Sequence, residues 1–128
     1  ADARIPILPQ APAVVRFISA EPLLGPLPLG SPTGTRWPYL HWAILGGESG
    51  PGARSCDVDW IRRLKNECQK WRVPVFIKQL GSKPISCIQT RQPQDDWVRI
   101  MCQKDKKGGD PEEWPEDLRV REFPGERG

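Results

Sequence analysis

The stretch that decides the fold is residues 40–81, LHWAILGGESGPGARSCDVDWIRRLKNECQKWRVPVFIKQLG. It contains two short apolar runs, Leu40–Gly47 and Val73–Gly81, with a candidate helix, Asp57–Arg72, between them. Nearly continuous apolar character over so few residues is typical of strands that are covered on both faces. Strand, loop, helix and strand in this order form a βαβ unit, so we expect the two strands to be parallel.

The helix prediction depends on the spacing of its apolar residues. Ile61, Leu64, Cys68 and Trp71 recur every three or four positions and form one apolar stripe. The other face carries charged and amide side chains, namely Arg62, Arg63, Lys65, Asn66, Gln69 and Lys70. Asp57 is suited to cap the N-terminus of this helix.

An earlier run, Ala13–Ala20, is rich in β-branched and aromatic residues and predicts a third strand. Residues 21–39 are rich in proline and glycine, so we expect an irregular crossover or a short helical turn there. Residues 82–107 contain two β-like segments that predict a hairpin, and residues 108–128 form a charged tail whose end we expect to be mobile. The apolar residues expected to pin this tail to the body are Trp114, Leu118, Val120 and Phe123.

Composition narrows the function classes. The 128 residues are 38% hydrophobic and 27% charged, as in a modest soluble domain, and no apolar run approaches the roughly 18–20 residues that span a bilayer. Because the chain begins with neither a secretion signal nor Met, we expect a cytoplasmic protein that is trimmed or a piece of a longer one. The four cysteines, at positions 56, 68, 87 and 102, lack zinc or redox spacing, so we expect free thiols and no metal site.

The net charge of +3 is unevenly distributed. Residues 1–107 carry 16 Lys and Arg against 9 Asp and Glu, a net +7, whereas residues 108–128 carry 3 against 7, a net −4. A basic body attracts phosphate or nucleic acid. A solvated helix face with an acidic tail explains the same charges, and we favour that interpretation.

Charged side chains follow all three predicted strands. Glu21 comes after the first strand, Glu48 after the second, and Lys78 with Gln79 ends the third, at intervals of 27 and 30 residues. Parallel neighbouring strands would direct all of them to one mouth at the C-terminal edge of the sheet, where α/β folds place their ligand sites. The alternative is structural, because these charges also suit the capping and neutralising of loops.

A glycine pair, Gly46 and Gly47, precedes Glu48 and Ser49 at the end of the second strand. Because glycine has no Cβ, the pair allows a ligand or another backbone to approach the strand end closely. A tight bend without a ligand explains the pair equally well.

Four segments together resemble one known family. They are VRFISAEPLLGPL, HWAILGGESGPGAR, DWIRRLKNECQKWRVPVFIKQLG and DPEEWPEDLRVREFP, which cover most of residues 4–81 and 104–124. They are similar to the C-terminal half of the phage- and mobile-element-associated, radical-SAM-like proteins with a three-cysteine motif, a family of unknown function. The order of SAEPLLGP and GGESGPGAR is quite specific to it.

The resemblance implies an α/β fold that is a partial, half TIM-barrel-like βα repeat. Residues 1–81 would be the half-barrel with parallel strands, followed by the hairpin of residues 82–107 and the acidic tail of residues 108–128. The family's N-terminal CxxxCxxC loop resembles the iron–sulfur loop of radical SAM enzymes, and this chain lacks it. We therefore expect no cofactor chemistry, and no enzyme activity, from this chain alone.

The resemblance also implies site residues. Gly46, Gly47, Glu48 and Ser49 would line the cofactor side of the mouth, near the adenine or ribose of S-adenosylmethionine. Neighbouring wall positions of the ligand mouth would be Glu21, Lys78 and Gln79.

Three functions remain open at this stage. The first is a C-terminal barrel half that keeps a small-ligand mouth, and the second is a non-enzymatic binding or assembly module from a mobile element. The third is a nucleic-acid-associated protein that uses the basic residues Arg62, Arg63, Lys65, Lys70 and Arg72. A half-barrel leaves sheet edges and a core face uncovered, so we expect completion by the missing N-terminal half, by a second copy or by residues 82–107 folding back, and self-association if the chain stands alone.

Overall fold

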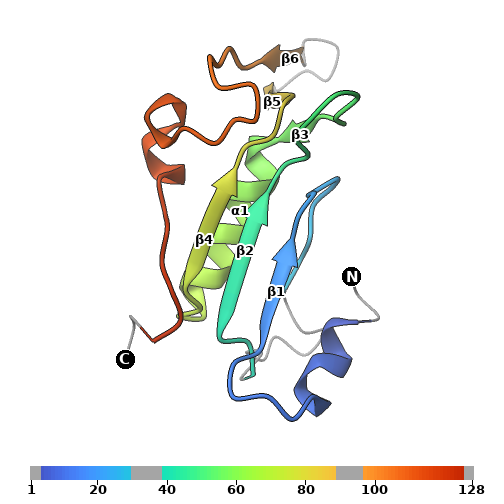
Figure 1. The fold of residues 1–128 in the computed structure, drawn as a ribbon, viewed down its shortest axis with the longest axis vertical. Helices are drawn as coiled ribbons and strands as arrows, with labels where there is room; N and C mark the ends of the chain where they lie inside the picture. Colours follow the sequence, from blue (N-terminus) through green and yellow to red (C-terminus); the bar gives the residue numbers. More distant parts are fainter. Residues whose placement is uncertain (1–3, 30–38, 89–96, 126–128) are drawn as a thin grey trace.

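The computed structural model describes residues 4–29, 39–88 and 97–125 (Figure 1). Its elements, in order, are η1 (Ile5–Gln10), β1 (Phe17–Ala20), β2 (Trp42–Gly46), β3 (Cys56–Asp57), α1 (Val58–Lys70), β4 (Val75–Gln79), β5 (Pro84–Ile88), β6 (Trp97–Ile100), η3 (Pro111–Glu113) and η4 (Glu116–Leu118). The fold is mixed α/β, with one α-helix lying across one face of a parallel sheet (Figure 1). None of the described helices is long and apolar enough to cross a membrane.

The main sheet has the strand order β1-β2-β4, and both strand pairs are parallel. The predicted βαβ unit is therefore confirmed, with α1 as the connection between β2 and β4. Each strand is shorter than the apolar run that predicted it. At β4 the reason is Pro74, which lacks an N–H and stands just before the strand, while its carbonyl accepts a hydrogen bond of 3.0 Å from Ala43 N.

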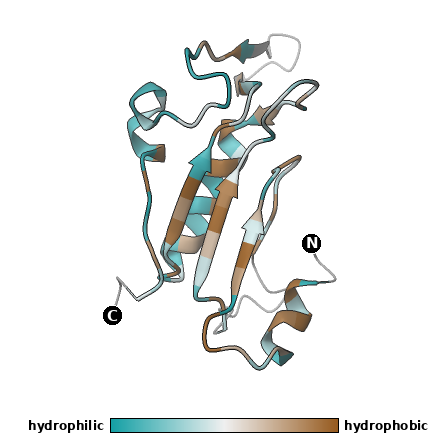
Figure 2. Cartoon of the chain, viewed as in Figure 1, coloured by the Kyte–Doolittle hydropathy of each residue, from teal (hydrophilic) through white to brown (hydrophobic). Residues whose placement is uncertain are grey.

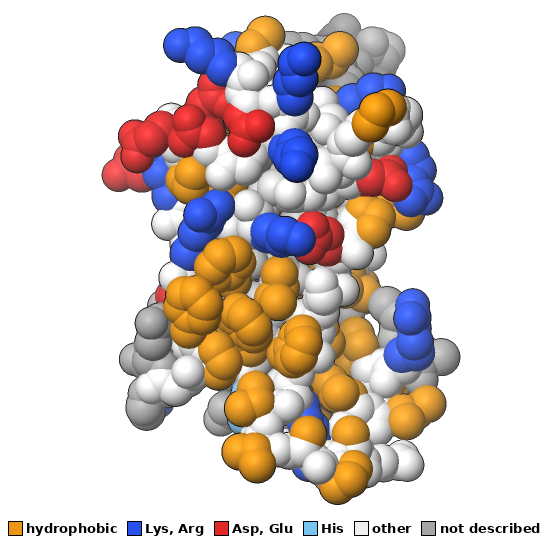
Figure 3. Space-filling view, in the orientation of Figure 1, with side chains coloured by type: hydrophobic (Ala, Val, Ile, Leu, Met, Phe, Trp, Pro, Cys, Tyr) orange, Lys and Arg blue, Asp and Glu red, His pale blue; other side chains and the backbone are white. Residues whose placement is uncertain are grey.

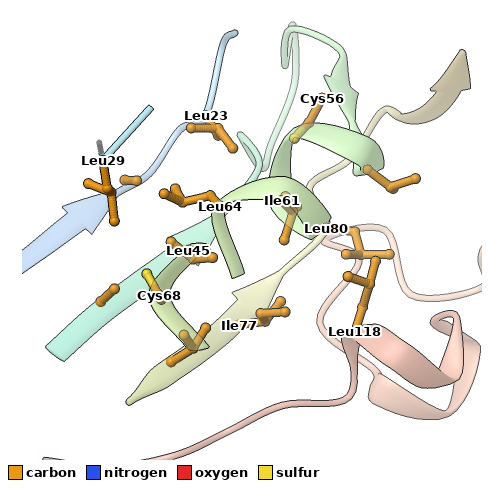
Figure 4. Close-up of a cluster of buried hydrophobic side chains, with 14 of the residues drawn as sticks. Leu23, Leu29, Leu45, Cys56, Ile61, Leu64, Cys68, Ile77, Leu80 and Leu118 are labelled. Atoms are coloured by element: carbon orange, nitrogen blue, oxygen red, sulfur yellow. The ribbon is translucent and has the colours of Figure 1, made fainter. Parts of the chain in front are cut away.

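Helix α1 supplies most of the core. The carboxylate of Asp57 caps it by accepting a hydrogen bond of 2.9 Å from Asp59 N. Ile61, Leu64 and Cys68 are fully buried and pack with the leucines and isoleucines of the strands (Figure 4). Burial of each large aliphatic side chain contributes about 1.5–3 kcal/mol, so this one stripe fixes α1 on the sheet.

Lys65 does not lie on a solvated face, so that prediction is wrong. Only 6% of the residue is exposed, and its Nζ donates a hydrogen bond of 2.8 Å to the carbonyl oxygen of Asp117. The short helix η4 packs beside α1 and covers this side chain. The buried ammonium is therefore satisfied by the backbone of a segment far away in the sequence.

Residues 21–29 begin the crossover from β1 to β2. The segment is irregular, as its composition predicts. It contains no helix or strand, yet Leu23 and Leu29 are buried in the core. The backbone N–H of Leu29 donates to Glu67 Oε2 at 2.8 Å, which ties the segment to α1. The rest of the predicted crossover, up to residue 38, lies outside the described residues.

A second, smaller sheet has the order β3-β5-β6. β5 and β6 pair in antiparallel fashion, with Ile85 opposite Ile100, as expected of a hairpin in residues 82–107. β3 is too short to leave a sequence signal, and it pairs with β5 in parallel. The chain between β5 and β6, residues 89–96, lies outside the described residues.

Residues 119–123, which we call the C-terminal strap, run along the outer edge of β4 (Figure 1). Ile77 N donates to Val120 O at 2.9 Å, and Glu122 N donates to Val75 O at 2.8 Å. Trp114 and Leu118 are buried just before the strap, as predicted for residues that pin the tail. The predicted mobile end, residues 126–128, lies outside the described residues.

The main sheet does not close into a barrel within the described residues, and its face opposite α1 is open. Rings of Phe17, Trp42, Phe76 and Phe123 contact one another there, at centroid distances of 5.4–6.2 Å. We call these four residues the aromatic patch. Figure 3 shows hydrophobic side chains gathered on this face, with charged groups beyond them, and Figure 2 shows the apolar strands underneath.

The burial of Leu118 predicts that the tail contributes to stability. We expect Leu118→Ala to lower the free energy of unfolding by about 2–4 kcal/mol, because the side chain is fully buried and its removal leaves a cavity. Glu112→Ala is the control, since the side chain of Glu112 is 86% exposed, and we expect a change below about 0.5 kcal/mol. Urea unfolding followed by circular dichroism measures both, and equal stability of the two variants would contradict the packing of the tail.

Candidate functional site

Four of the predicted residues meet at the C-terminal edge of the main sheet. Glu21 Oε1 lies 3.3 Å from Lys78 Nζ and accepts a hydrogen bond of 3.2 Å from Gln79 Nε2. Gly46 stands between them, because a Cβ built on it would lie 3.5 Å from the carboxyl carbon of Glu21 and 3.2 Å from Gln79 O. We call Glu21, Gly46, Lys78 and Gln79 the mouth.

Parallel pairing is the reason that these residues meet. Gly46 is the register partner of Gln79, after an irregularity in the pairing between Leu45 and Gly46. The backbone N–H of Leu23 donates to Gly46 O at 2.9 Å, which draws the chain after Glu21 toward β2. The mouth therefore follows from strand order and register.

Gly47 has a packing role. A Cβ at this position would lie 2.2 Å from the carbonyl oxygen of Leu80, far inside any real contact. Of the two explanations for the glycine pair, close approach by another backbone thus accounts for Gly47. The close approach lets Gly47 N donate to Gln79 O at 3.1 Å and so continues the contact between β2 and the chain after β4.

Glu48 pairs with Arg54. Its Oε2 accepts from the backbone N and the Nε of Arg54, both at 2.8 Å, and its Oε1 accepts from Nη2 at 2.9 Å. These hydrogen bonds lower the pKa of Glu48 to about 2 and raise the pKa of Arg54. The carboxylate is fully occupied in closing its own loop, so it does not face Lys78.

The loop of residues 48–54 is also tied to the connection between β4 and β5. Ser82 N donates to Glu48 O at 2.8 Å, and Gly50 N donates to Ser82 Oγ at 3.0 Å. Ser49, the fourth residue of the predicted cofactor set, is exposed. The loop therefore has a defined shape that depends on its own backbone contacts.

Arg54 is a site residue that the sequence analysis did not single out. It lines a groove of roughly 740 Å³ along the outside of β1, together with Glu21 and residues of η1. The signal was present in the sequence, since an arginine follows the glutamate across a Gly-Pro-Gly turn at a distance of six residues. Through Arg54, the Glu48 loop reaches the border of the groove although Glu48 itself does not enter the mouth.

The mouth offers three kinds of polar group above an apolar face. Glu21 supplies a carboxylate whose side chain is 18% exposed, Lys78 an ammonium that is 56% exposed, and Gln79 an amide. Gln79 Nε2 also donates to Gly47 O at 3.0 Å, which fixes the orientation of the amide. Such a set can bind a small polar molecule through an ion pair and hydrogen bonds, and it contains no activated nucleophile.

The buried thiols are poor metal ligands and nucleophiles. Burial raises the pKa of Cys56 and of Cys68 to about 12, so both remain protonated at neutral pH. Across the three described stretches, no three His, Cys, Asp or Glu side chains converge as a group that could hold a metal ion.

The basic residues of α1 are partly neutralised within the chain. Arg62 bonds to both Asp59 and Asp117, and Lys65 lies 3.9 Å from a carboxylate oxygen of Asp117. Lys70 Nζ lies over the ring of Trp71 at 5.2 Å. The ion pairs of Arg62 and Lys65 reduce the positive potential that the nucleic-acid hypothesis needs, whereas Lys70 keeps its charge.

Residues 1–112 match the family described as "Protein of unknown function (DUF5131)". The chain belongs to this family. The match to DUF5131 takes in the main sheet, α1, the mouth and the second sheet, and it ends before the C-terminal strap. No curated protein and no solved structure matches the chain.

The contact at Gly47 gives a first prediction for the site. We expect Gly47→Ala to destabilise the protein by about 2–3 kcal/mol, because the added methyl group would overlap the Leu80 backbone. Gly25→Ala is the matched control, since nothing lies within 4 Å of a Cβ at that position, and its effect should stay within about 1 kcal/mol. Thermal unfolding of both variants measures the two changes in stability. A Gly47→Ala protein as stable as Gly25→Ala would refute the packing role.

The Glu48–Arg54 pair predicts a pH dependence. The folded-state pKa of Glu48, about 2, lies below its ordinary 4.5, so the carboxylate contributes stability above pH 4.5 that is lost as the pH falls toward 2. Glu48→Gln should therefore destabilise the protein at neutral pH, and the difference from the wild type should shrink between pH 4.5 and 2. Urea unfolding across this range is the measurement. In an Arg54→Gln background the effect of Glu48→Gln should be much smaller, and an undiminished effect would contradict the pairing.

Proposed function

We propose that this chain is the C-terminal part of a TIM-barrel-like, radical-SAM-like protein that keeps a small-ligand mouth without the iron–sulfur chemistry. The observation that carries the proposal is the open face of the main sheet. One end of this face bears the aromatic patch, at the N-terminal ends of the strands, and the other end bears the mouth, at the C-terminal ends.

The half-barrel part of the proposal rests on which faces of the main sheet are covered. Parallel sheets are normally covered on both faces, whereas here α1 covers only one. The open face contains packed aromatic rings, which suit a barrel interior better than a solvated surface. The remaining strands of such a barrel would come from a missing N-terminal half or from another polypeptide.

The ligand part of the proposal rests on position and chemistry. α/β folds bind ligands beyond the carboxyl ends of their strands, where Glu21, Lys78 and Gln79 stand. A carboxylate beside an ammonium suits a small ligand that carries both donor and acceptor groups, such as a zwitterion or a nucleoside. We propose no reaction for this site.

S-adenosylmethionine fits the predicted set only in part. Gly46 borders the mouth, but Gly47 packs against Leu80, Glu48 bonds to Arg54, and Ser49 is not joined to the mouth by any contact within the described residues. The four residues do not form one cradle, so we derive no chemical step through this cofactor. A non-enzymatic binding or assembly module is the alternative function, and the open edge of β1 favours it.

The mouth is tested by thermal shift of the full chain with S-adenosylmethionine and with adenosine as probes. A probe concentration ten times its dissociation constant should raise the free energy of unfolding by about 1.4 kcal/mol, which corresponds to a rise in Tm on the order of 5 °C. Lys78→Met should abolish the rise, and Lys106→Met, a change at an exposed lysine outside the mouth, should leave it intact. No shift with either probe, or a shift that survives Lys78→Met, would remove these ligands from the mouth.

A further inference from the structure

The two edges of the main sheet differ in whether another segment covers them. The outer edge of β4 is covered by the C-terminal strap, whereas β1 is an edge strand among the described residues. An exposed edge presents unpaired N–H and C=O groups and is a template for pairing with another chain. This asymmetry indicates where the chain can bind a partner.

The strap closes the β4 edge with both backbone and side-chain bonds. Besides the two backbone bonds to Ile77 and Val75, Arg121 donates to the carbonyl oxygens of Ile77 and Lys78, at 3.2 and 3.1 Å. Trp42 Nε1 donates to Glu122 O at 2.8 Å. A second polypeptide would have to break all of these contacts to pair with β4.

The β1 edge, with the sequence FISA, carries no charge or proline, and its protection is limited to its length of four residues and to the η1 side chains Ile5 and Leu8 that border the groove. Large hydrophobic residues are exposed around it, and Val14 (94%), Phe17 (48%) and Leu24 (45%) are the most prominent. The groove along β1 leaves roughly 740 Å³ beside the strand.

We propose that β1 pairs with β1 of a second copy of this chain, in antiparallel orientation about a two-fold axis. The carbonyl of Arg16 faces β2, so the alternation of the strand directs the backbone groups of Phe17 and Ser19 outward. A two-fold axis at Ile18 sets Phe17 opposite Ser19 of the other copy, and both of these side chains are exposed.

Charge disfavours the parallel alternative and leaves the antiparallel one neutral. With the axis at Ile18, Arg16 lies opposite Ala20 and Glu21 opposite Val15 of the second copy, so no like charges face each other. Parallel pairing in register would set Arg16 against Arg16 and Glu21 against Glu21. Glu21 keeps its contacts to Lys78 and Gln79 through Oε1, so this pairing leaves the mouth unchanged.

The strap then limits the assembly to two copies. Within the main sheet, β1 is the one open edge among the described residues, so pairing through it is isologous and closed, whereas two open edges would allow a chain of sheets. The inference goes beyond the proposed function, because it names a partner for the β1 edge and leaves the open face uncovered. It does not depend on the ligand mouth. The dimer is tested by measuring the mass of the protein in solution, whereas the mouth is tested by the rise in Tm that a ligand causes.

Light scattering after size exclusion tests the pairing over a range of protein concentrations. The 14.5 kDa chain should approach twice its mass as the concentration rises. Ser19→Lys places a charge on the edge and should weaken dimerisation at least tenfold, while Ser49→Lys, the same change at an exposed loop serine, should leave it unaltered. A monomer at every concentration, or a dimer insensitive to Ser19→Lys, would overturn the proposal and leave the edge to a different polypeptide.

Two strap variants test the limit of two copies. Deletion of residues 119–128 and Glu122→Pro, which removes the N–H that donates to Val75 O, should each give masses above the dimer. Phe123→Ala keeps the backbone bonds and should remain dimeric. Circular dichroism identifies the variants that stay folded, and a folded strap variant that remains a dimer would refute the guarding role of the strap.

Discussion

The packing of α1 against one face of the main sheet is the contact on which the rest of the structure depends. Ile61, Leu64 and Cys68 are buried against that face, and Leu23 and Leu29 extend the same layer. Burial on one side holds three parallel strands together, but α1 does not cover their other face or their edges, and the strap covers the β4 edge only. The aromatic patch, the strap and the open β1 edge are the consequences of this one-sided core.

The parts of the fold that the sequence predicts are those with a local signal. The stripe of α1 and the apolar runs of the strands repeat at short intervals, so periodicity identifies them. The strap has no such signal, because it joins β4 through backbone atoms and Arg121, and its apolar residues, Val120 and Phe123, lack the two-residue spacing of a strand. The burial of Lys65 was missed for a related reason, since its partner is a carbonyl oxygen 52 residues away.

The mouth was predictable to the extent that strand order determines it. Glu21, Lys78 and Gln79 meet because they end neighbouring parallel strands, and a sequence can indicate that. Glu48 ends a strand of the same sheet, yet Arg54 offers it three donors within one loop, and this local pairing prevails over the more distant Lys78. The spacing of charges predicts which edge they share, whereas competition among nearby donors decides which of them pair.

The open face has a direction that constrains whatever covers it. Its N-terminal end is aromatic, and its C-terminal end carries a carboxylate, an ammonium and an amide. A second copy that pairs through β1 would join two such faces side by side without covering either, and their polar ends would point in opposite directions. Complete cover therefore needs a polypeptide that is apolar at one end and polar at the other, which is the pattern that a barrel's own remaining strands would provide.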